Sequence, residues 1–331
     1  STPKPSSAAS DVYKRQNIIF LCVGTPTKKN TNAADLSQIF NAAKEVSRNI
    51  KSSKIIINKS TVPVTTGDQI EKIISKKAKK KYFSVVSNPE FLREGEAIRD
   101  FIYPDRVVIG TSNKKTNKVL KSLYSPLVSK GAKYINTSRR GAELIKYASN
   151  AFLATKISFI NELANLCEKT NIDIKEISQG MGSDQRIGDR FLRAGPAYGG
   201  SCFPKDTQAL IAVASEAGSD SAFLSAVLES NEARFTQIAK VVTQSLGDDS
   251  GKKIAILGLA FKAGTDDIRE SPSLKIASLL LESGMKVVGY DPQVNMAPLQ
   301  GLEMADSPEE AAKEADALLV LTEWKLSLIH I

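Results

Sequence analysis

The sequence has few of the residues on which disulfide scaffolds, zinc sites and membrane spans depend. Its three cysteines, Cys22, Cys167 and Cys202, are widely spaced and odd in number, which argues against a disulfide framework and against a bound metal. The single histidine, His330, lies in a tail of foreign appearance and receives no catalytic role. No apolar run approaches the roughly 20 residues of a membrane span, and the polar residues 1–10 lack a signal-peptide core. These absences favour a soluble protein of the reducing cytoplasm with no membrane partner.

The excess of positive charge is the next constraint. The net charge is +9, and five lysines lie between positions 76 and 81. No aromatic residue interrupts this run and no nucleic-acid-binding motif surrounds it, so we interpret it as a solvated helix end and expect no nucleic-acid partner. A mildly basic surface would also suit an anionic nucleotide substrate.

The spacing of apolar residues predicts an α/β chain with a helical centre. A length of 331 residues suggests two or three domains. Strand-like runs first alternate with helical spacing, which is typical of βα units around a mostly parallel sheet. Strands are expected at 17–23, 54–58, 82–87 and 106–110, and helices at 35–50 and 65–75.

After about residue 137 the spacing becomes helical, and from residue 252 the βα alternation returns. Helical spacing covers 141–180 and 221–246, and the second stretch, which lacks Gly and Pro, is long enough to bridge two domains. Strands are expected at 254–257, 286–290 and 317–321, with a helix at 272–284. We therefore predict two Rossmann-like parallel-sheet domains joined by a central helical domain that contains a long helix.

These changes of pattern divide the chain into three domains and two tails. The domains are expected at 17–137, 138–248 and 249–325. The polar segment 1–16 and the apolar segment 326–331 look foreign to the gene product, with ordinary frayed termini as the alternative.

The segment 199–206, GGSCFPKD, is the strongest chemical signal. Two glycines allow a backbone to approach a ligand closely, and Cys202 follows them. A nearby cation such as Lys205 favours a reactive thiolate, and Asp206 is within reach of the cysteine if a helix starts after it. A Gly-rich turn with a buried, inert cysteine is an equally good interpretation of this segment taken alone.

Lys146 and Asn150 are spaced i and i+4, so a helix would place them on one face. Together they could donate hydrogen bonds to a developing oxyanion. On spacing alone, an exposed polar stripe is the better interpretation.

Two loops that follow expected strands carry polar groups. Residues 88–95, NPEFLREG, include Glu90 and Glu94, a candidate base and a candidate cofactor contact. Such loops are where α/β sheets place ligands. Ser60 and Thr61 follow another strand and could hold a water or a cofactor. The alternatives are acids at a helix start for the glutamates and helix capping for the hydroxyls.

A fourth segment starts at Gly258 and includes Lys262 and Arg269. It lies at an expected strand-to-helix junction, which is a natural place for a phosphate. It lacks the full glycine fingerprint, so as a dinucleotide motif it is weak.

Together, and in this order from about Asn17 to Trp324, these segments resemble the UDP-glucose/GDP-mannose dehydrogenase family. The sequence SCFPKD, with Arg186 upstream, is similar to the UDP-glucose branch, because GDP-mannose enzymes more often carry leucine after the cysteine. The resemblance implies an NAD-binding Rossmann domain, a central dimerisation domain with the cysteine loop, and a UDP-sugar-binding domain, in that order.

The resemblance also implies an activity, the NAD-dependent oxidation of UDP-glucose to UDP-glucuronate through intermediates bound to Cys202. The implied catalytic residues are Cys202 as nucleophile, Lys146 and Asn150 as oxyanion donors, Asp206 and Thr61 for water and proton transfer, and Glu90 as base. The implied NAD contacts are Thr25, Ser60, Glu94, Lys205 and Arg269. The implied substrate contacts are Phe91, Leu92, Arg93, Glu94, Lys146, Asn150, Tyr198, Gly199, Lys262 and, from a neighbouring subunit, Arg186.

One departure from the family bears on these expectations. The first βαβ unit of the family, with its Gly-rich pyrophosphate turn, would precede Asn17, where residues 1–16 stand. We therefore expect a chain truncated at both ends, with an incomplete NAD-binding domain. The alternatives are a fragment that binds a nucleotide-sugar without turnover and a dehydrogenase for GDP-mannose or another nucleotide-sugar. A homodimer is expected, with 221–246 as its interface.

Overall fold

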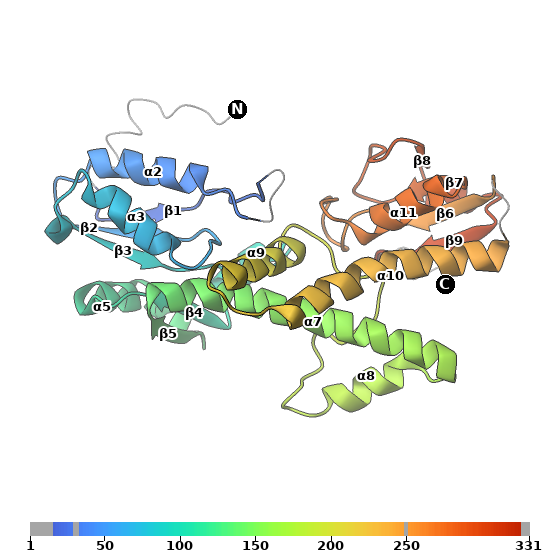
Figure 1. Ribbon diagram of the computed structural model, residues 1–331, viewed down its shortest axis with the longest axis horizontal. Helices are drawn as coiled ribbons and strands as arrows, with labels where there is room; N and C mark the ends of the chain where they lie inside the picture. Colours follow the sequence, from blue (N-terminus) through green and yellow to red (C-terminus); the bar gives the residue numbers. More distant parts are fainter. Residues whose placement is uncertain (1–15, 29–32, 248–250, 326–331) are drawn as a thin grey trace. The chain divides into compact units, whose positions relative to one another are not determined.

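The computed structural model describes residues 16–28, 33–247 and 251–325 (Figure 1). The predicted foreign tails, apart from Gln16, and His330 lie outside these residues. The chain divides into two compact units, Ser1–Ser149 with Ala212–Gly218, and Asn150–Ile211 with Ser219–Ile331. Among the described residues, no helix has the length and apolarity needed to cross a membrane.

The first unit contains a five-stranded sheet in the order β1-β2-β3-β4-β5. All neighbouring strands are parallel except β3 and β4, which pair antiparallel, so the prediction of a mostly parallel sheet is confirmed. The strands are β1 (Ile18–Leu21), β2 (Lys54–Asn58), β3 (Phe83–Ser87), β4 (Arg106–Gly110) and β5 (Lys133–Thr137).

Helices cover both faces of this sheet, because its inner strands are apolar on both sides. Ile56 packs in one buried cluster with Ile39 and Ile70, while the next residue, Ile57, packs in another with Leu120. This two-residue alternation is what a sheet covered on both faces requires. The helices are α2 (Ser37–Arg48), α3 (Thr66–Ser75), η1 (Lys80–Tyr82), α4 (Ala97–Ile102), α5 (Lys114–Leu123) and α6 (Ser125–Val128).

The helical centre agrees with the predicted change of spacing. Its helices are α7 (Arg139–Thr170), α8 (Ile174–Gly182), α9 (Phe203–Glu216) and α10 (Ala222–Leu246). The second long stretch, predicted as a possible bridge, lies within the second unit as α10, whereas α7 belongs to both units.

The second unit also contains a four-stranded parallel sheet in the order β8-β7-β6-β9. Ile254 and Ile256 pack with Phe235 of α10 and Leu280 of α11, while the intervening Ala255 packs with other partners on the opposite face. The elements are β6 (Lys253–Leu257), α11 (Pro272–Glu282), β7 (Lys286–Tyr290), β8 (Leu302–Met304), α12 (Pro308–Ala312) and β9 (Ala317–Val320).

Candidate active site

In the first unit, the loops after β1 and β2 are tied together by hydroxyl groups. Ser60 Oγ accepts a hydrogen bond from Val23 N at 3.0 Å and lies 2.7 Å from Val23 O, to which it donates. Thr25 Oγ1 donates to Thr61 O at 2.7 Å. The alternative that Ser60 and Thr61 cap a helix is wrong, because the residue before α3 is Thr65. These hydroxyl groups join the loop after β1 to the loop after β2 at the carboxyl end of the sheet.

Lys146 and Glu90 form a sheltered ion pair. The two groups lie 3.1 Å apart, and the Lys146 side chain is only 4% exposed. Glu90 Oε2 also accepts from Leu92 N at 2.6 Å, which fixes the carboxylate at the start of its loop. The alternative of an exposed polar stripe on α7 is wrong, since Asn150 is buried as well.

The ring of Phe91 contacts two cations of the first unit. Its centroid lies 4.1 Å from the Arg106 guanidinium carbon and 5.3 Å from Lys146 Nζ. Cations over an aromatic face are attracted by its negative potential. Phe91 therefore helps to hold the Lys146 ammonium beside Glu90.

Lys59 was not singled out from the sequence, although it lies in the same unit, directly after β2. Its Nζ donates to Pro89 O at 3.4 Å. Burial lowers the pKa of Lys59 to about 8, and the charges of Glu90 and Cys22 oppose this shift. A lysine between a buried strand and Ser60 is the signal that could have drawn attention to it.

In the second unit, the cysteine loop leads directly into α9. Cys202 is exposed, and Asp206 N donates to Cys202 O at 2.8 Å, so the helical turn predicted after the cysteine is present. This bond places Cys202 immediately before α9, one turn ahead of the Asp206 carboxylate. The alternative of a buried cysteine is therefore wrong for Cys202.

Asp206 is the buried centre of the polar cluster in this unit. Its side chain is 1% exposed, and its Oδ2 accepts from Asn150 Nδ2 at 2.6 Å. Its other oxygen contacts Lys205 Nζ. Asn150, from one predicted motif, and Lys205 and Asp206, from another, are thus brought together near the base of α9.

The two glycines before the cysteine are required by the protein's own chain. A Cβ at Gly199 would overlap Glu270 O and lie 2.6 Å from Pro272 Cδ, and one at Gly200 would lie 2.6 Å from the Phe261 ring. Gly200 N also donates to Arg269 O at 3.1 Å. The predicted close approach to a ligand stays a prediction, and the structure adds a second reason for these glycines: they let the cysteine loop pack against Phe261 and the segment before α11.

Asn231 of α10, which the sequence did not single out, holds the same loop from another side. Its Oδ1 accepts from Tyr198 N at 2.9 Å and its Nδ2 donates to Tyr198 O at 3.0 Å. The Tyr198 ring packs edge-on against Phe203, and its buried hydroxyl has no hydrogen-bond partner within the described ranges. Burial raises the pKa of Tyr198, which keeps that hydroxyl neutral.

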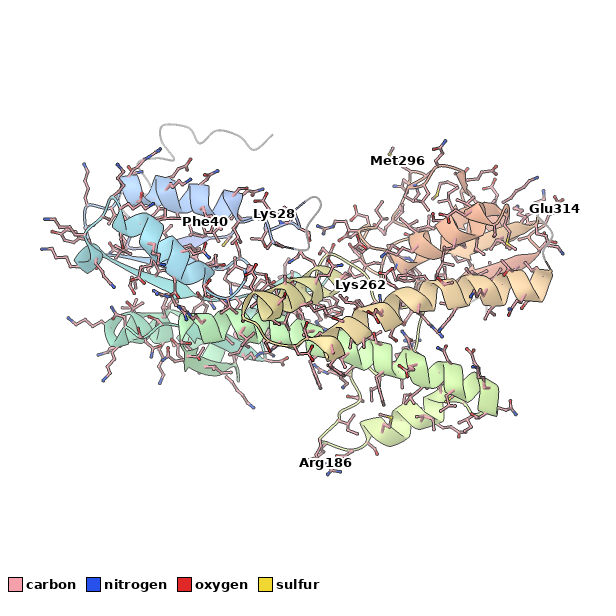
Figure 2. The ribbon with its side chains drawn as sticks, in the orientation of Figure 1. Lys28, Phe40, Arg186, Lys262, Met296 and Glu314 are labelled. Carbon is pink, nitrogen blue, oxygen red and sulfur yellow. The ribbon has the colours of Figure 1, made fainter. Side chains whose placement is uncertain are left out.

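The arginines predicted as ligand contacts form ion pairs with acids close to them in the sequence. Arg186 pairs with Asp184 at 2.5 Å and Arg269 with Asp267 at 2.6 Å. In the first unit, Arg93 pairs with Asp100 at 2.7 Å and with a second acid. Figure 2 shows Arg186 pointing outward from the loop after α8, where its side chain is 88% exposed.

At the predicted phosphate position after β6, two backbone N–H groups already donate hydrogen bonds within the protein. Leu259 N and Ala260 N donate to Asp291 Oδ2 at 2.8 and 3.0 Å, and Trp324 Nε1 donates to the same atom. These two backbone groups therefore bind a carboxylate of the protein. Lys262, a little further along, lies 5.7 Å from the centroid of the Phe261 ring.

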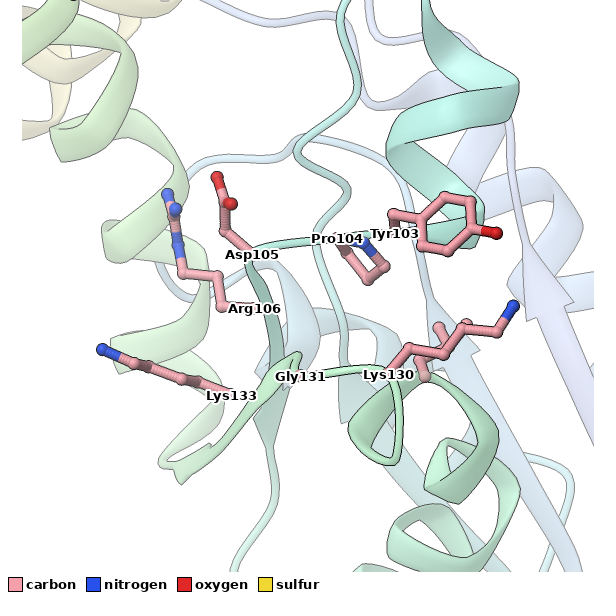
Figure 3. Close-up of a pocket in the computed structure, with 8 residues that line it drawn as sticks. Tyr103, Pro104, Asp105, Arg106, Lys130, Gly131 and Lys133 are labelled. Carbon is pink, nitrogen blue, oxygen red and sulfur yellow. The ribbon is translucent and has the colours of Figure 1, made fainter.

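A pocket of about 580 Å³ lies elsewhere in the first unit, lined by residues of 103–106 and 127–133 (Figure 3). Lys130 Nζ lies 4.8 Å from the centroid of the Tyr103 ring at its rim. None of the predicted site residues lines it, so we assign it no role. Among the residues described, no cluster of His, Cys, Asp or Glu is placed to hold a metal ion.

Known proteins resemble this chain across all three of its regions. Residues 4–128 match the NAD binding domain of the UDP-glucose/GDP-mannose dehydrogenase family, residues 140–233 its central domain, and residues 255–326 its UDP binding domain. The chain therefore belongs to the UDP-glucose/GDP-mannose dehydrogenase family.

Individual relatives and solved structures agree with this membership. A UDP-glucose 6-dehydrogenase of Rhizobium meliloti is 46% identical over 97% of this chain and 74% of its own length. One of Bacillus subtilis is 46% identical over 93% of this chain and 70% of its own length. The structure of a UDP-glucose dehydrogenase from Pyrobaculum islandicum has a TM-score of 0.91 and 35% identity, covering 97% of this chain and 76% of that one.

Proposed function

We propose that this chain catalyses the NAD-dependent four-electron oxidation of UDP-glucose to UDP-glucuronate. The observation that carries the proposal is the exposed Cys202 thiol at the start of α9, one turn before a buried Asp206 that Asn150 holds by a hydrogen bond. Family membership and the relatives named UDP-glucose 6-dehydrogenase support the choice of substrate.

Cys202 is the proposed nucleophile. Its thiolate adds to the C6 aldehyde of the partly oxidised sugar, which gives a thiohemiacetal and keeps the reactive aldehyde bound. Oxidation of this adduct gives a thioester. Water then cleaves the thioester, releases the carboxylate and returns the cysteine thiol.

The remaining catalytic groups stabilise charge and move protons. We assign Lys146 and Asn150 as donors to the oxyanion that develops at C6. Asp206 and Thr61 would position the attacking water and assist proton transfer. Glu90, which pairs with Lys146, would take the proton of that water as general base.

The loop after β1 is where we propose that NAD approaches. Apart from its chain neighbours, a Cβ at Gly24 would meet within 4 Å only Gln38 Oε1, at 4.0 Å, among the described residues. Gly24 lies in the loop that follows the carboxyl end of β1, and such loops are where α/β sheets bind ligands. We assign Thr25, Ser60, Glu94, Lys205 and Arg269 to hold the cofactor. NAD, when bound, accepts the hydride at each of the two oxidations.

The substrate contacts remain part of the proposal. The residues that we assign to the nucleotide-sugar are Phe91, Leu92, Arg93, Glu94, Tyr198, Gly199 and Lys262, together with Lys146 and Asn150. Arg186 would reach the substrate of a neighbouring subunit, and its exposure supports that assignment.

The apolar face of α7 supports a homodimer. Phe152, Phe159 and Leu166 follow one another at intervals of seven residues, and all three are exposed. This spacing makes a single stripe on a helix, which is typical of helix pairing. We propose a second copy of the chain as its partner. This places the interface on α7, whereas the sequence predicted α10.

A substrate panel tests the proposed function. The protein would be incubated with NAD and, separately, UDP-glucose, GDP-mannose and a UDP-N-acetylhexosamine, and acid products would be detected by mass spectrometry. We expect UDP-glucuronate. An acid product from GDP-mannose alone would show that the chain is instead a dehydrogenase for GDP-mannose. Binding of UDP-glucose without any acid product would support a binding protein.

A further inference from the structure

Glu143, on the second turn of α7, has no role in the proposed chemistry, yet both oxygens of its carboxylate accept hydrogen bonds. It is 2% exposed and accepts three hydrogen bonds of 2.8 Å, from Thr65 N, Gly67 N and Ser87 Oγ. These donors belong to the start of α3 and the last residue of β3. One side chain therefore joins three elements of the first unit.

The position of this junction relates it to the ion pair of the site. Ser87 precedes Glu90 by three residues, and Glu143 precedes Lys146 by three residues. The Glu143–Ser87 bond thus lies just upstream, on both chain segments, of the 3.1 Å contact between Lys146 and Glu90. Because only two residues separate the contacts on each segment, a shift of Ser87 relative to Glu143 would also move Glu90 relative to Lys146.

The packing leaves little freedom at the junction. A Cβ at Gly67 would lie 2.8 Å from Glu143 Oε1 and 2.9 Å from Ser87 Oγ, so only glycine allows α3 to come this close. A carboxylate is needed because it offers two oxygens to three donors, while an amide offers one. Burial raises the pKa of Glu143, and its three hydrogen bonds oppose that shift. The three donors therefore stabilise the charged form of the buried carboxylate.

We propose that Glu143 is a positioning residue, which holds β3 against α7 so that Lys146 meets Glu90 at the distance the reaction needs. This rests on the proposed function, because the importance of Lys146 and Glu90 comes from it. Glu143 touches no reacting atom and acts only through these two residues.

Two variants of different severity test the proposal. Ser87→Ala removes one donor and leaves the two backbone bonds in place, while Glu143→Gln keeps the size of the side chain and loses one acceptor. The control is Arg140→Ala, which removes another contact between α7 and α3, the 2.7 Å pair with Asp68, on the exposed surface. Thermal melting would show that each variant is folded.

Steady-state kinetics is the first readout. Small misplacements of catalytic groups cost up to about 100-fold in rate. We expect kcat to fall about tenfold in Ser87→Ala and further in Glu143→Gln, with the KM for UDP-glucose within about twofold of the wild type. Arg140→Ala should keep the wild-type kcat. Equal kcat values in Ser87→Ala and Arg140→Ala would overturn the proposal.

The second readout does not need turnover. Labelling of Lys146 by an amine-acylating reagent, followed by peptide mass spectrometry, measures how well its ammonium is held and sheltered. We expect faster labelling in Ser87→Ala and Glu143→Gln than in the wild type and Arg140→Ala. Unchanged labelling in both variants would overturn the positioning role. If the wild-type protein makes no acid product, the proposed function fails, and this readout still decides the role of Glu143.

Discussion

The side-chain amide of Asn231 binds both backbone hydrogen-bonding groups of Tyr198, at 2.9 and 3.0 Å. Asn231 lies on α10, and Tyr198 lies four residues before Cys202. The amide copies the pairing that a neighbouring strand would supply to an extended segment. The loop that carries the proposed nucleophile is therefore fixed before α9 begins.

Replacing this amide should destabilise the second unit. In Asn231→Ala the Tyr198 N–H and C=O groups are left buried without partners, each at a cost of about 1–3 kcal/mol. Asn161→Ala is the matched variant, because it removes a single hydrogen bond, that from Gly195 N to Asn161 Oδ1 at 2.8 Å. Urea denaturation should give the larger loss in Asn231→Ala. A larger loss of stability in Asn161→Ala would show that the two hydrogen bonds between Asn231 and Tyr198 stabilise the unit less than the single bond of Asn161.

The glycines of the cysteine loop give a second stability prediction. Gly199→Ala would place a methyl group in overlap with Glu270 O, so the loop must shift. Such overpacking typically costs about 1–3 kcal/mol. Gly195→Ala is the control, since a Cβ there meets nothing within 4 Å. We expect a lower urea midpoint for Gly199→Ala and a midpoint close to the wild type for Gly195→Ala. Equal midpoints would contradict the close packing at Gly199.

Lys59 predicts how stability varies with alkaline pH. Its pKa is lowered from 10.5 to about 8 in the folded protein, chiefly by burial. Between these two values the unfolded chain binds more protons than the folded one, so Lys59 makes the free energy of unfolding rise with pH across this range. Below about pH 8 the full cost of the buried charge is present.

The variant Lys59→Met should remove that contribution. We expect its free energy of unfolding, measured with urea at several pH values between about 8 and 10.5, to rise less with pH than that of the wild type. Identical pH dependence in the two proteins would show that Lys59 titrates at its ordinary pKa in the folded state.

The exposed stripe on α7 predicts which substitution dissociates the proposed dimer. Phe159→Glu places a charge in the middle of the stripe, whereas Phe223→Glu places one on α10, where Phe223 is also exposed. Light scattering during gel filtration should show a monomer for Phe159→Glu and a dimer for both the wild type and Phe223→Glu. A dimer in Phe159→Glu together with a monomer in Phe223→Glu would return the interface to α10.

The sequence was most informative where burial leaves a local pattern. Strands 54–58, 106–110 and 286–290 were predicted to the residue, because each is a compact apolar or β-branched run with clear ends. Strand β5 was missed because most of its side chains are exposed, and β8 because it has only three residues. Local patterns of this kind cannot reveal an edge strand with so few buried positions.

Parts of the candidate site were predicted for an incomplete reason or were missed. The glycines at 199 and 200 were identified correctly as sites of close approach, and the groups that approach them within the chain, Glu270, Pro272 and the Phe261 ring, were not foreseen. Glu143 was missed because its partner Thr65 is 78 residues away, and Asn231 because Tyr198 is 33 residues away. Such contacts depend on tertiary packing, which spacing along the sequence does not encode.

The most direct test of the central claim is the yield of NADH per molecule of UDP-glucose, measured by absorbance with limiting sugar, in the wild type and in Cys202→Ser. The account predicts two NADH per sugar and UDP-glucuronate as product for the wild type, because the aldehyde stays bound to Cys202 until its second oxidation. It predicts that the serine variant stalls before the acid. Full conversion to UDP-glucuronate by Cys202→Ser, or a wild type that reduces no NAD with UDP-glucose, would contradict it.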